Sequence, residues 1–127
     1  MCPRARPARM RGPPVRKPFT VRVRMSDQLP PDSSLYDIAA ANVVDMGNRL
    51  MEQHEDADAW EAASGMLAGA IHYWLYARQP CGDPTCADCA DMSSAEERLR
   101  HLLDEVRESA RGSDYYHSPH DHNVGNA

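Results

Sequence analysis

The chain has 127 residues, of which 42% are hydrophobic, 26% are charged and 6% are aromatic. A chain of this length forms one small domain and has no room for a second sizeable core, so a large multidomain enzyme is excluded. The net charge of −5 divides unevenly, because residues 1–24 carry eight basic side chains and no acid. Residues 25–127 carry 19 acids against six arginines, so the two parts have charges of +8 and −13.

The basic segment at the start of the chain is predicted to be a disordered extension covering residues 1–30. Five prolines precede Met25 and disfavour both a helix and a core strand. Three interpretations stay open. The segment is a basic arm, it is a targeting segment, or the protein starts at Met25, which is followed by a typical initial Ser-Asp. Nucleic acid is expected to bind this segment if it binds at all, because the acidic body repels phosphates.

The first predicted helix covers residues 33–53. Its apolar residues recur at spacings of three and four, which is the pattern of an amphipathic helix. Ser34 lies three residues before Asp37 and is a typical helix start. The apolar positions are Leu35, Ile38, Ala39, Val43, Met46 and Leu50.

The second predicted helix covers residues 58–79, with Asp58 as its N-cap and Pro80 as its stop. Residues 62–77 contain no charged side chain on any face. These 16 residues would rise about 24 Å, less than the roughly 30 Å of a membrane core, so no membrane span is expected. We expect this helix to lie in the middle of a bundle or at the interface with a second copy or another protein partner.

The third predicted helix runs from Ser93 or Ser94 to Gly112. Each serine is followed three residues later by a glutamate, as in a capping box. The predicted apolar face comprises Leu99, Leu102, Leu103, Val106 and Ala110. The sequence therefore predicts an all-α fold, a small three-helix bundle over residues 31–112, followed by a tail over residues 113–127.

Three cysteines lie in the segment between the second and third helices and give the strongest chemical signal. Cys81, Cys86 and Cys89 follow a C-x4-C-x2-C spacing. Thiolates at such spacing converge on one soft metal ion, so the segment predicts a zinc site. Because three cysteines crowd into nine residues, a disulfide framework is disfavoured and a reducing, cytoplasmic setting is expected.

A structural zinc site requires four ligands, so the three thiolates need a histidine. The tail supplies His117 and His120 beside Tyr115 and Tyr116, two aromatic side chains that can anchor it to the bundle. We predict that the metal ligands are Cys81, Cys86 and Cys89 with either His117 or His120.

Two other uses of the cysteines stay open. The spacing matches the first three ligands of a plant-type [2Fe–2S] ferredoxin, but no fourth cysteine follows Cys89. A thiol redox function can use the pair Cys86 and Cys89, although neighbouring acids disfavour reactive thiolates. A third hypothesis is an acidic protein-interaction module that binds no metal.

The functional hypothesis is a small cytoplasmic binding or regulatory module with structural zinc. A secretory signal is not expected, since no apolar stretch of the required length precedes Met25. No set of nucleophile, base and oxyanion hole can be assembled from these spacings, which disfavours an enzyme. The partner is expected to be a second copy bound through the second helix, because a bundle this small does not bury all its large apolar side chains.

Overall fold

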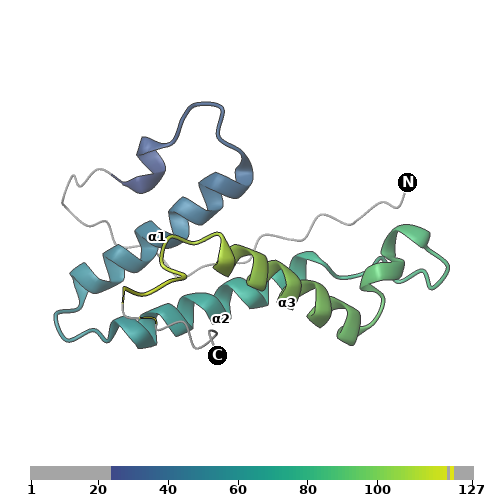
Figure 1. The fold of residues 1–127 in the computed structure, drawn as a ribbon. Helices are drawn as coiled ribbons and strands as arrows, with labels where there is room; N and C mark the ends of the chain where they lie inside the picture. Colours follow the sequence, from purple (N-terminus) through teal and green to yellow (C-terminus); the bar gives the residue numbers. More distant parts are fainter. Residues whose placement is uncertain (1–23, 120, 122–127) are drawn as a thin grey trace. The chain divides into compact units, whose positions relative to one another are not determined.

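The computed structural model describes residues 24–119 and residue 121. Within this range the fold is all-helical, as predicted (Figure 1). The elements in chain order are the 3-10 helix η1 (Met25–Gln28), α1 (Leu35–Gln53), α2 (Ala59–Ala77), the 3-10 helix η2 (Ala87–Met92) and α3 (Ala95–Arg111). The predicted disorder of the basic extension falls mainly on residues 1–23, which lie outside the described residues, as does His120.

Each α-helix begins at the side chain that the sequence indicates. Ser34 and Asp37 form a capping box on α1, in which the Ser34 hydroxyl accepts from the Asp37 N–H at 3.2 Å. The Asp58 carboxylate accepts from the Trp60 N–H at 2.8 Å, as an N-cap does. At α3 the capping box is formed by Ser94 and Glu97, which decides between the two predicted starts.

Contacts divide the chain into two compact parts that meet between Tyr73 and Trp74, inside α2. The first part contains η1, α1 and most of α2. A β-carbon added at Gly47 on α1 would lie 3.1 Å from the Met66 sulfur on α2, so glycine permits a close approach of these helices. No residue of α2 is buried, and Trp60 is 86% exposed. Contrary to the expectation that α2 lies in the middle of a bundle, the single chain does not cover this apolar helix.

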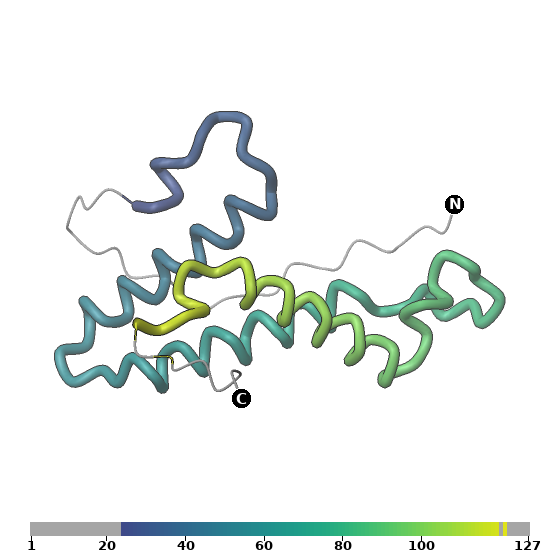
Figure 2. The backbone as a smooth tube through the Cα atoms, in the orientation of Figure 1, coloured from purple at the N-terminus to yellow at the C-terminus, as the bar shows by residue number. Residues whose placement is uncertain are grey.

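The carboxylate of Asp45 on α1 holds η1 in place. Figure 2 traces the backbone of both elements. It accepts hydrogen bonds from the Met25 N–H at 2.7 Å, the Ser26 N–H at 3.0 Å and the Ser26 hydroxyl at 2.8 Å. The Asp45 residue is only 6% exposed. The Ser26 N–H is the main cause that lowers the pKa of Asp45, since it stabilises the charged form.

The second part contains the end of α2, η2 and α3. Glu105 on α3 accepts from the Trp74 indole N–H at 2.9 Å and from the Arg78 guanidinium at 3.1 Å. The Arg78 guanidinium also lies over the Trp74 ring, 4.3 Å from its centre. This Trp74–Arg78–Glu105 contact joins the last turn of α2 to α3.

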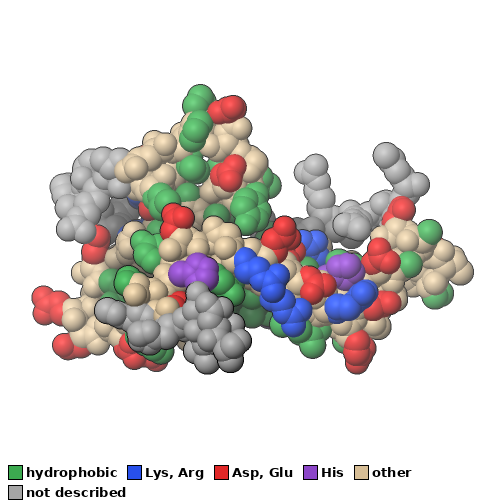
Figure 3. Space-filling view, viewed as in Figure 1, with side chains coloured by type: hydrophobic (Ala, Val, Ile, Leu, Met, Phe, Trp, Pro, Cys, Tyr) green, Lys and Arg blue, Asp and Glu red, His purple; other side chains and the backbone are tan. Residues whose placement is uncertain are grey.

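The buried apolar core of the described residues is small. It consists of Ala41 on α1, Cys89 in η2 and Leu102 on α3. Many larger apolar side chains are exposed among acidic ones, as the face drawn in Figure 3 shows. No helix in the described part of the chain combines the length and the hydropathy that a membrane crossing requires.

Replacement of Asp45 by Asn tests the η1 contact. Because the folded pKa of Asp45 lies below its unfolded value, its stabilising effect is present above about pH 4 and is lost as the pH falls through the folded pKa. We expect the NMR amide signals of Met25 and Ser26 to shift with the carboxyl titration in the wild type. In Asp45→Asn this titration is absent at both amides, whereas the exposed Asp27→Asn retains it.

Replacement of Glu105 by Gln tests the contact between α2 and α3. The variant loses a charge-assisted acceptor for two donors, and we expect the free energy of unfolding to fall by about 1 kcal/mol, with the small value reflecting solvent screening. Urea unfolding followed by tryptophan fluorescence measures this change. The control is Glu108→Gln, one turn along the same helix, and an equal loss in both variants contradicts the contact.

Candidate metal centre

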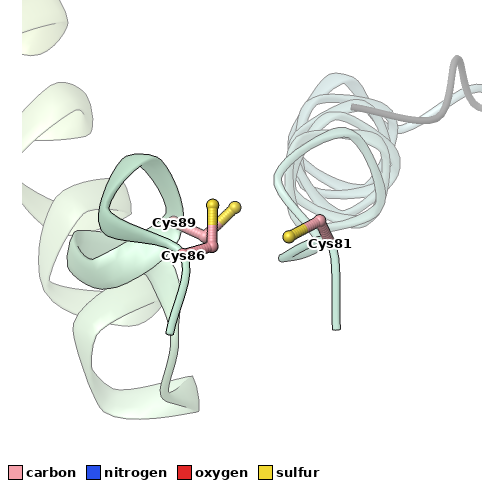
Figure 4. A group of neighbouring side chains, drawn as sticks. All are labelled: Cys81, Cys86 and Cys89. Carbon is pink, nitrogen blue, oxygen red and sulfur yellow. The ribbon is translucent and has the colours of Figure 1, made fainter. Parts of the chain in front are cut away.

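The three cysteines of the loop converge, as the sequence predicts. The sulfur atoms of Cys81, Cys86 and Cys89 all lie within 4.8 Å of one another. Figure 4 shows the Cys81 sulfur pointing across the loop toward the Cys86 and Cys89 side chains. Cys81 is exposed, Cys86 is half-buried and Cys89 is 5% exposed, and all three are present as thiols. The group can hold a metal ion.

Gly82 turns the chain directly after Cys81. Its φ of +87° lies in the left-handed region, which other residues adopt only at a cost. Nothing lies within 4 Å of a β-carbon built at Gly82, so the backbone conformation, and not crowding, is what favours glycine here. A glycine directly after Cys81 is the signal in the sequence for this tight turn.

A second turn places Cys86. The Asp83 carboxylate accepts from the Thr85 N–H at 2.8 Å and from the Thr85 hydroxyl at 2.7 Å. The Thr85 N–H is the main cause that lowers the pKa of Asp83. The Cys86 N–H then donates to the Asp83 carbonyl at 3.2 Å and closes the turn. An ionised carboxylate therefore stands two residues from Cys81, where it attracts a cation.

The third cysteine is positioned by η2, which is attached to the start of α3. Arg98 donates to the Met92 carbonyl at 2.7 Å, at the end of η2. The Ser93 hydroxyl donates to the Glu97 carboxylate at 2.9 Å, which is the main cause that lowers the Glu97 pKa. Cys89 thus sits on a segment that is fixed from its C-terminal side.

Two cavities lie beside the thiols. A cavity of about 50 Å³ lies between the end of α2 and η2 and is lined by Cys89 and Met92 among others. A larger hollow of about 540 Å³ is formed by the loop itself, and both Cys86 and Cys89 line it. A further ligand can therefore approach these two sulfur atoms from the hollow.

The histidines among the described residues do not belong to the thiol group. Among the described residues, the close ligand group consists of the three cysteines and includes no histidine. His117 is exposed and follows α3, where its ring packs edge-on against Tyr116 with centroids 4.8 Å apart. Tyr115 is 95% exposed. Contrary to our expectation, it does not anchor the tail. His101 on α3 has a buried Nε2 without a hydrogen-bond partner.

The turn between α1 and α2 forms a hollow with acidic side chains in its lining. Its volume is about 710 Å³, and its lining includes His54, Glu55, Asp56, Asp58 and Glu61. The side chains of this turn do not form a group with metal-ligand spacing within the described residues. Among the described residues, the candidate metal ligands are therefore the three cysteines.

Substitution of Gly82 by Ala tests whether the left-handed turn positions Cys81. We expect the variant to lose about 1–2 kcal/mol of stability, because alanine disfavours this backbone conformation. The matched control is Gly65→Ala in α2, which also has open space around its β-carbon. That helical substitution should instead stabilise the protein by about 0.5–1 kcal/mol. Thermal unfolding gives both values, and a neutral Gly82→Ala contradicts the argument.

Comparison with known proteins supplies no relative on which to base a function: no family model matches the chain, and neither the curated proteins nor the solved structures contain a match.

Proposed function

We propose that this chain is a small binding or regulatory module in which Cys81, Cys86 and Cys89 hold one structural zinc ion. The observation that carries the proposal is the convergence of three sulfur atoms to within 4.8 Å. Tetrahedral zinc with Zn–S bonds of about 2.3 Å requires sulfur separations of about 3.8 Å. A contraction of about 1 Å at most brings the three thiols to this geometry.

The same distances favour a single ion over an iron–sulfur cluster. A cluster is held by four cysteines spread over its iron atoms, whereas thiolates that share one ion lie close together. The part of the chain that the structure describes contains three cysteines. A mononuclear site needs no further cysteine, since a histidine can complete it.

The metal would act on the loop and not on a substrate. The ion would cross-link Cys81, near the end of α2, to Cys86 and Cys89, which precede α3. Because the ligands must lose their protons and come together, metal binding contributes directly to folding stability. A reducing, cytoplasmic setting suits this role, because it protects three thiols from oxidation.

The fourth ligand of the proposed site is a histidine of the tail, either His117 or His120. An imidazole is neutral, so it adds no negative charge to an ion that already carries three thiolates. It would also close the coordination sphere, as structural zinc requires.

Metal analysis of the full chain purified without chelator tests the proposal. We expect about one zinc per chain in the wild type and little in Cys86→Ser, because two thiolates do not form a closed site. A chelator should lower the melting temperature of the wild type and leave that of Cys86→Ser unchanged. The control is Cys2→Ser, which keeps the three clustered cysteines.

Other outcomes of this measurement support other functions. Bound iron with visible absorption indicates a cluster. Absence of metal with a reversible, low-pKa thiol titration indicates redox chemistry. Absence of metal with unaltered folding of Cys86→Ser indicates an acidic interaction module.

A further inference from the structure

His117 and the thiol group lie at opposite ends of α3. The three cysteines precede this helix and His117 follows it, as Figure 1 shows for the loop and the tail. From Ala95 to Arg111 the helix rises about 24 Å. The six residues from Arg111 to His117 span at most about 21 Å when fully extended. Because the structure folds residues 112–117 into turns, their actual reach is shorter.

His117 of the same chain is therefore poorly placed to complete its own site. It would have to leave its contact with Tyr116, and the end of α3 would have to unwind. Unwinding would break the Gly112 N–H bond to the Glu108 carbonyl, which is 3.1 Å long. A second copy can supply the same imidazole without any of these changes.

The outer face of α3 offers a surface for that second copy. Leu99, Leu103 and Val106 are 52%, 42% and 40% exposed, whereas Leu102 is buried. The three exposed residues are spaced by four and three, which is the spacing of a seam between two paired helices. This α3 seam runs from the cysteine end of the helix toward its tail end.

We propose that two copies of the chain pair antiparallel along the α3 seam, so that the partner's His117 completes each three-thiolate site. Antiparallel pairing brings the C-terminal end of one α3 beside the N-terminal end of the other, which removes the separation of about 24 Å. A two-fold axis then generates two equal sites. The inference rests on the proposed zinc function and adds the source of its fourth ligand.

Several features of the second part of the chain fit this arrangement. The hollow lined by Cys86 and Cys89 gives the incoming imidazole access to the sulfur atoms. Tyr115 and Tyr116 are 95% and 50% exposed next to His117, so both can pack on a partner. Antiparallel helices also have opposed dipoles, which is favourable.

Complementation between two defective variants tests the shared site. Full chains of Cys81→Ser, which lacks one thiolate, and His117→Gln, which lacks the imidazole, are mixed as metal-free proteins and loaded with Co²⁺. The visible absorption of Co²⁺ distinguishes three sulfurs and one nitrogen from three sulfurs and water. Neither variant alone should give the spectrum of three sulfurs and one nitrogen, because Cys81→Ser has only two of the thiolates and His117→Gln has no imidazole at this position.

The expected signal of the mixture follows from dimer statistics. Half of the dimers contain one copy of each variant, and each mixed dimer has one complete site, so the spectrum should reach about a quarter of the wild-type intensity. The shared site is overturned if the mixture shows no spectrum of three sulfurs and one nitrogen while the wild type gives the full intensity. That result does not contradict the zinc function. A wild type that binds no metal overturns both proposals.

One pair of variants checks the surface, and His101→Gln is the control for His117→Gln as the variant that removes the ligand. Leu103→Glu on the α3 seam should give monomers by light scattering and should lose the nitrogen ligand. Leu67→Glu on α2 should remain a dimer and keep the nitrogen ligand. The two leucines have similar exposure, 42% and 53%, and circular dichroism confirms folding in each case. Loss of the nitrogen ligand in His101→Gln, or dimer loss only in Leu67→Glu, overturns the proposal.

Discussion

The close approach of three sulfur atoms is the constraint on which the chemistry of this chain depends. Local structure imposes it: the left-handed Gly82 turns the chain after Cys81, an Asp-Thr turn precedes Cys86, and η2 carries Cys89. The Asp-Thr turn is held by its own hydrogen bonds, whereas η2 is held by the Arg98 side chain of α3. The folded loop therefore brings the three thiols close together, and an ion that binds all three would require only a small further contraction.

The same loop also contributes to the small core of the chain. Cys89 is one of three buried apolar residues among those described, so the same side chain belongs to the core and to the group that could hold a metal ion. Small domains that bury little apolar surface are commonly completed by a metal or by association. If the proposed ion binds Cys89, its loss would affect both the loop and the packing between the end of α2 and η2.

Local signals in the sequence predicted the helices and the convergence of the cysteines. Ser34, Asp58 and Ser94 begin their helices because the capping side chain and the N–H that it accepts from are two or three residues apart. Cys81, Cys86 and Cys89 lie in one short loop, so their spacing alone restricts how far apart they can lie. In both cases the relevant distance is set by a few residues of backbone.

Contacts between elements far apart in the sequence were not predictable in this way. Glu105 meets Trp74 and Arg78 only because α3 packs beside the end of α2, and helical periodicity does not determine that register. The same holds for Asp45, whose partners lie 19 and 20 residues earlier. The distance from His117 to the cysteines likewise depends on the length and direction of α3, which spacing in the sequence does not report.

The exposed apolar face of α3 relates the packing of the chain to the proposed zinc site. Hydrophobic periodicity predicted one apolar face on α3, but the structure divides it: Leu102 is buried inside the chain, and Leu99 and Leu103 remain open. Burial of the open residues against a second copy would gain roughly 25 cal/mol per Å² of apolar surface, a gain independent of the ion. If the partner's imidazole also binds the ion, metal binding and association stabilise each other, because each favours the same paired state. The affinity for zinc then rises with the concentration of the protein itself, a property that a site closed within one chain does not have.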